Sequence, residues 1–81
     1  MKPRSQALGT KNMVGAKVVE LRKAKGIKQG EFLTKLHLEG LNISPTSLSR
    51  LEGQHRLVQD QEIVIIAKVL EIDVRELLGL M

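Results

Sequence analysis

Hydroxyl and guanidinium side chains gather in one short stretch of this chain, between residues 44 and 52. The residues with these groups are Ser44, Thr46, Ser47, Ser49 and Arg50. Only Leu48 and Leu51 are apolar within it, so a helix here would give little of its surface to a core. The remaining face would carry hydrogen-bond donors and acceptors toward a partner. This stretch therefore predicts a binding surface.

Residues suited to metal or covalent chemistry are sparse. The chain has no cysteine, which excludes disulfides, thiolate zinc sites and iron–sulfur clusters. The two histidines, His37 and His55, stand 18 positions apart with no carboxylate at metal-ligand spacing. Nothing resembles a nucleophile motif or a glycine-rich phosphate loop. We therefore expect no enzymatic activity, no metal and no cofactor.

The charge is basic overall and unevenly placed. The formal net charge is +4, and the first 28 residues hold eight Lys and Arg against one Glu. Residues 57–81 instead hold five acids against two cations. A basic N-terminal part and an acidic C-terminal part indicate that one face of the protein binds a polyanion. From charge alone, the alternative that the chain is simply a domain with many exposed lysines, and binds no polyanion, stays open.

The length and patterning predict one small domain. The chain has 81 residues, and with Phe32 as its only aromatic the core must be aliphatic. Residues 1–11 are basic and lack periodicity, which predicts a mobile arm before a domain over residues 12–81. No secretory signal is apparent, and the longest uncharged apolar run, residues 63–67, is too short for a membrane span. We expect a soluble, cytoplasmic protein.

Apolar spacing and end signals predict five helices and no strands. The expected ranges are about 12–24, 29–38, 44–52 and 60–70, followed by a short helix begun by Asp73. Ser44-Pro45 is a strong start signal, because serine caps a helix and proline suits its first position. Gly26 and Gly53 end two of the helices. The fold class is therefore all-α.

Five segments stand in an order typical of one family. They are Val14-Gly15 with Val18 and Leu21-Arg22; Gly26-Ile27-Lys28-Gln29 with Leu33; Ile43-Ser44 with Leu48-Ser49-Arg50-Leu51-Glu52-Gly53; Ile66-Ala67-Lys68-Val69-Leu70; and Glu76-Leu77-Leu78. Over residues 13–79 they resemble the lambda-repressor-like (Cro/Xre-type) helix-turn-helix family. The link from Thr34 to Ile43 is longer than in short-turn members and resembles a long-turn branch. Thr34 replaces a small residue, and Glu71 replaces a glycine that usually ends the fourth helix.

The resemblance implies a compact five-helix domain that binds double-stranded DNA by sequence and regulates transcription, as a repressor. The helix at about 44–52 would lie in the major groove, with Thr46, Ser49 and Arg50 toward base edges. Five residues match positions that contact or neighbour the phosphate backbone: Lys28, Gln29, Ser44, Ser47 and Arg56. Arg22 and Glu52 match a structural ion pair between the first and third helices.

Two other kinds of partner were weighed. An RNA-binding module suits the charge, but single-strand readers stack bases on aromatic rings and Phe32 is needed in the core. An antitoxin or adaptor that uses the same fold to bind a toxin or regulator stays open as the alternative function. Ile65, Val69 and Ile72 form a second apolar stripe, which predicts a homodimer interface unless it packs within the domain.

Overall fold

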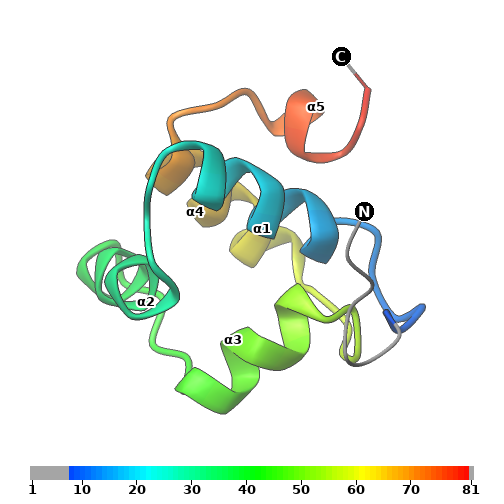
Figure 1. Cartoon of the computed structure of the whole chain (residues 1–81), viewed down its shortest axis with the longest axis horizontal. Helices are drawn as coiled ribbons and strands as arrows, with labels where there is room; N and C mark the ends of the chain where they lie inside the picture. The colour runs from blue at the N-terminus through cyan, green and yellow to red at the C-terminus, as the bar shows by residue number, and fades with distance from the viewer. Residues whose placement is uncertain (1–7, 81) are drawn as a thin grey trace.

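Five helices make up the described part of the chain. The computed structural model describes residues 8–80, with α1 (Gly15–Ala24), α2 (Gln29–Leu38), α3 (Pro45–Glu52), α4 (Asp60–Leu70) and α5 (Val74–Leu77) (Figure 1). Residues 8–80 contain no strand, so the predicted all-α class is confirmed. All five predicted helices are present. The first begins at Gly15 rather than at Asn12.

The helices pack around α1 and α4. α1 contacts α3 and α4, α2 contacts the same two helices, and α5 contacts α4. Figure 1 shows α3 and α5 at opposite ends of the molecule, with α1 crossing between them. Across residues 8–80, none of the helices has the length and apolar content needed to cross a lipid bilayer.

The core is aliphatic apart from one ring. Phe32 is fully buried, and the other buried apolar residues are Val14, Val18, Leu36, Leu48, Leu51, Ile66, Ala67, Leu70 and Leu77. α3 contributes only Leu48 and Leu51 to this cluster. α3 is therefore held by one narrow apolar edge, and most of its circumference is left for other contacts.

Side chains close the starts of α3, α4 and α5. The Ser44 hydroxyl accepts the backbone N–H of Ser47 at 3.0 Å, and Pro45 occupies the first position of α3, as predicted. The Glu62 carboxylate accepts the N–H of Gln59 at 2.9 Å at the start of α4. The Asp73 carboxylate accepts the N–H of Arg75 at 2.8 Å at the start of α5. These bonds satisfy N–H groups that a helix leaves unpaired.

The end of α4 has a left-handed residue. Glu71, the C-cap, has a φ of 57°. A residue with a Cβ is strained in this region, and glycine is the usual choice there. The sequence departure at Glu71 therefore falls on a position where the backbone itself favours glycine.

The residues just before α1 are tied to the loop that follows α3. The N–H of Gly9 donates to the carbonyl of Gly53 at 2.8 Å, and the N–H of Lys11 donates to the carbonyl of Gln54 at 3.0 Å. Residues 8–11 of the predicted mobile arm are thus bonded to the domain. Residues 1–7, the rest of that arm, lie outside the described residues.

Candidate functional site

The outward face of α3 carries the residues predicted to meet base edges. Thr46, Ser49 and Arg50 are all exposed, whereas Leu48 and Leu51 on the opposite side are fully buried. The Arg50 guanidinium makes a long bond of 3.4 Å to the carbonyl of His55 in the following loop. α3 therefore exposes two hydroxyls and one guanidinium, while its buried leucines anchor the helix to the core.

A buried ion pair fixes the C-terminal end of α3 to α1. Arg22 Nε donates to one Glu52 carboxylate oxygen at 2.9 Å, and Nη2 donates to the other at 3.2 Å. The two residues are only 7% and 4% exposed. Arg22 Nη1 also donates to the carbonyl of Ile27 at 2.9 Å, just before α2 begins. Arg22 thereby joins α1, the turn before α2, and α3.

Gln29, the first residue of α2, connects to the same carboxylate. Its side-chain amide nitrogen donates to Glu52 at 3.0 Å and to the Ser49 hydroxyl at 3.3 Å. The sequence predicted a phosphate contact for Gln29 and gave no sign of these two bonds. They run from the buried ion pair to the exposed face of α3.

Lys28 precedes Gln29 as the N-cap of α2. Its backbone is extended, and no side chain within residues 8–80 caps this helix start. The Lys28 side chain is exposed. The free N–H groups of α2 and the ammonium group of Lys28 therefore provide a positive end beside Gln29.

Arg56 is engaged within the protein. Its Nε donates to the carbonyl of Ser47 at 2.9 Å, and Nη1 and Nη2 donate to the Glu62 carboxylate at 3.0 and 2.8 Å. Nη1 also donates to the carbonyl of Leu57 at 2.9 Å. These hydrogen bonds with Arg56, together with the N–H of Gln59, hold the pKa of Glu62 below its ordinary value of 4.5, although burial opposes the shift. The sequence suggested a phosphate contact and missed this bridge from α3 to α4.

Asn12 joins the start of α1 to the exit of α3, a role that sequence reasoning also missed. Its amide nitrogen donates to the carbonyls of Leu51 and Arg56 at 3.1 and 2.9 Å. Its amide oxygen accepts the N–H groups of Val14 and Gly15 at 3.1 and 2.8 Å. An Asn directly before an apolar helical pattern is a known start signal, and that signal was present here.

Glycine allows α1 and α3 to approach closely at this junction. A Cβ added to Gly15 would overlap the backbone carbonyl oxygen of Leu51. A Cβ added to Gly9 would overlap the carbonyl of Gln54 in the same way. The absence of a side chain at Gly15 therefore lets α1 pack against the backbone of α3.

The predicted dimer stripe is partly covered. Ile65, Val69 and Ile72 are each half-buried and pack against the core cluster. Val64, on the same helix, is more open, at 57% exposed. The packing inside the domain takes up part of the stripe and leaves part of it accessible.

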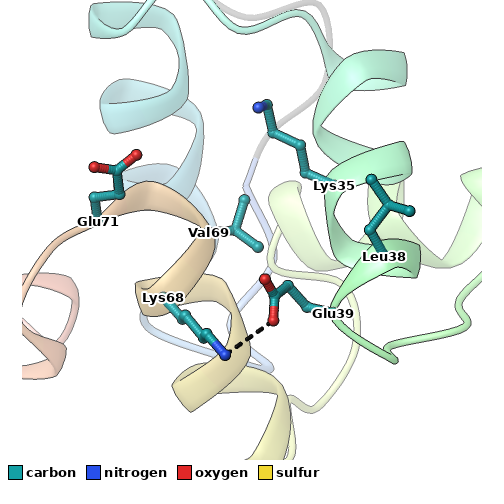
Figure 2. Close-up of a pocket in the computed structure, with 6 residues that line it drawn as sticks. All are labelled: Lys35, Leu38, Glu39, Lys68, Val69 and Glu71. Carbon is teal, nitrogen blue, oxygen red and sulfur yellow. Dashed lines mark ion pairs between the residues drawn. The ribbon is translucent and has the colours of Figure 1, made fainter.

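A depression of about 270 Å³ lies between the C-terminal halves of α2 and α4. Figure 2 shows Lys35, Leu38 and Glu39 on one side and Lys68, Val69 and Glu71 on the other. Lys68 and Glu39 bridge it with an ion pair of 3.0 Å. Leu38 is 81% exposed at its edge.

Residues 8–80 contain no group of three or more His, Cys, Asp or Glu side chains arranged to hold a metal ion.

Comparison of the chain with protein-family models, curated proteins and solved structures found no match.

Proposed function

We propose that this protein is a lambda-repressor-like helix-turn-helix domain that binds double-stranded DNA by sequence and regulates transcription, with α3 as its recognition helix. One observation carries the proposal. The polar face of α3 is exposed while its other side is fixed by Leu48, Leu51 and the buried Arg22–Glu52 pair. A rigid helix with a hydrogen-bonding outer face suits insertion into the major groove.

The side chains on that face suit base recognition. The Arg50 guanidinium matches the O6 and N7 acceptors of guanine, a pairing worth about 1–3 kcal/mol of discrimination. The hydroxyls of Thr46 and Ser49 hydrogen-bond to base edges, and the Thr46 methyl suits contact with a thymine methyl. Base contacts of this kind would give the protein its sequence preference.

The surrounding polar groups suit the DNA backbone. Lys28 and the start of α2 would bind one phosphate, with Gln29 beside it. Ser44 and Ser47 lie at the start of α3 and would contact the same strand. Arg56 spends most of its donors on Ser47, Leu57 and Glu62, so we assign it the role of fixing α3 to α4.

We propose that the protein binds as a homodimer. Two recognition helices that read adjacent half-sites must lie about 34–36 Å apart, one turn of DNA. The accessible parts of Ile65, Val69 and Ile72, with Val64 beside them, provide apolar surface on α4 and after it. An Ile65→Glu/Val69→Glu variant should therefore sediment as a monomer.

A protein-interaction module, such as an antitoxin or adaptor, is the second candidate. The observation that favours it is the exposure of apolar side chains outside α3, with Leu38 on α2 at 81% and Val64 on α4 at 57% exposed. In that case a partner chain would cover this surface, and DNA binding would be weak and without sequence preference.

Selection from randomised duplex DNA tests the proposal. Wild type should enrich a palindromic site, and Arg50→Ala should lose the preference for a guanine within it. Arg75→Ala is the matched control, since Arg75 is an exposed arginine on α5, at the far end of the molecule from α3 (Figure 1). Salt-sensitive binding without enrichment would instead indicate non-specific attraction and favour the protein-interaction module.

A further inference from the structure

The Gln29 amide nitrogen lies between two acceptors of different kinds. It has two hydrogens, and its two partners are the Glu52 carboxylate at 3.0 Å and the Ser49 hydroxyl at 3.3 Å. Both oxygens of the buried Glu52 carboxylate accept hydrogen bonds from the Arg22 guanidinium, and a carboxylate paired in this way only accepts. The Gln29 amide must therefore turn its nitrogen, and not its oxygen, toward both partners.

This orientation of the Gln29 amide determines whether the Ser49 hydroxyl donates or accepts a hydrogen bond. A serine hydroxyl has one hydrogen to donate and lone pairs that accept. Because Gln29 donates to the Ser49 oxygen, the hydroxyl hydrogen is directed elsewhere. Ser49 lies on the exposed face of α3, so this hydrogen is available to a partner outside the protein.

We propose that Gln29 is a positioning residue that makes Ser49 a hydrogen-bond donor toward DNA. The proposal rests on the function proposed above. Ser49 then favours base edges with an acceptor, namely purine N7, guanine O6 or thymine O4, over the amino groups of adenine and cytosine. The buried Arg22–Glu52 pair thereby influences sequence preference through Gln29, without touching DNA itself.

Four proteins compared by quantitative selection test this inference: wild type, Ser49→Ala, Gln29→Met and the double variant. Ser49→Ala identifies the base pair that Ser49 reads. Gln29→Met keeps the length of the side chain and removes both donors. It should weaken the preference at that same base pair by about fivefold, the size of one hydrogen bond of about 1 kcal/mol. In the Ser49→Ala background, Gln29→Met should change that preference no further.

A rescue variant separates polarity from packing. Gln29→Lys keeps a donor near both Glu52 and Ser49 and should retain the wild-type preference at that base pair, although it raises affinity for all sequences. Gln61→Met, an exposed glutamine on α4, is the matched control and should behave as wild type. Thermal melts establish that each variant is folded.

Two results would overturn the inference, and they differ. If wild type selects a site but Gln29→Met weakens binding equally to all sequences in both backgrounds, Gln29 only contacts a phosphate. The proposed function then stands and the positioning role fails. If wild type selects no sequence, both proposals fail together.

Discussion

Arg22 and Glu52 share two hydrogen bonds, at 2.9 and 3.2 Å, in a site from which water is nearly excluded. Replacing Arg22 by Met should leave the Glu52 charge buried without its partner and lower the free energy of unfolding by about 3–5 kcal/mol. An Arg22→Met/Glu52→Met variant should regain much of that loss, because both charges are gone. Urea denaturation measures both, with exposed Lys23→Met as control. Equal midpoints for Arg22→Met and wild type would show that the pair is not needed for stability.

The Arg56–Glu62 pair predicts loss of stability in acid. The pKa of Glu62 is lower in the folded than in the unfolded chain, so ionised Glu62 stabilises the fold above about pH 4.5. That contribution disappears as the pH falls from 4.5 toward the folded-state pKa. Glu62→Gln should therefore be less stable than wild type at neutral pH, and its stability should fall less steeply with acid.

Urea denaturation from about pH 6 to about pH 2 measures these slopes. Asp73→Asn is the comparison, because Arg75 lowers the pKa of Asp73 from 3.8 to about 2. The stabilisation from Asp73 is therefore lost at lower pH, between 3.8 and about 2. A Glu62→Gln slope identical to that of wild type would contradict the role of this carboxylate.

Two glycines should respond to alanine in opposite directions. The Cβ of Gly15→Ala would meet the Leu51 carbonyl and force α1 away from α3, so we expect a loss of about 1–3 kcal/mol. Gly30 lies in α2 with open space around its Cβ position, so Gly30→Ala should gain about 0.5–1 kcal/mol from helix propensity. Thermal denaturation of the two variants compares them directly. If Gly15→Ala is as stable as wild type, α1 can move away from α3 to accommodate the added Cβ without loss of stability.

Replacing Glu71 should change the free energy of unfolding in a defined direction. Its φ of 57° strains a residue with a Cβ, so Glu71→Gly should raise the free energy of unfolding by about 1 kcal/mol. Lys68→Gly, within α4, is the comparison and should lower it by about 1 kcal/mol through helix propensity, in addition to losing the ion pair with Glu39. If Glu71→Gly destabilises the protein, contacts of the Glu71 side chain outweigh the backbone strain.

Local signals predicted the helices well, because their causes lie within a few residues of one another. Ser44-Pro45 begins α3 and Asp73 begins α5, as their residue types indicate. The range of α2 is also as predicted. The start of α1 differs by three residues, since the helix begins at Gly15 and Asn12 lies before it, where its side-chain oxygen accepts the N–H groups of Val14 and Gly15.

The polar contacts were harder to predict, because they depend on how distant segments meet. Arg56 and Glu62 are six residues apart, and Arg56 lies in the loop before α4, so helical spacing does not predict their contact. The Arg22–Glu52 contact followed from a resemblance and not from spacing. The link between Gln29 and Ser49 depends on the position of α2 against α3, which no local signal contains.

The contacts of Asn12 also bear on how fast the chain folds and unfolds. Its amide nitrogen bonds to carbonyls 39 and 44 residues away, so these bonds close about half of the 81-residue chain into a loop. Long closures are costly in entropy, and they form late, after neighbouring helices have met. Bonds absent from the transition state affect unfolding alone. Asn12→Ala should therefore speed unfolding and leave the refolding rate unchanged, so that Asn12 sets how long the folded protein lasts rather than how quickly it forms.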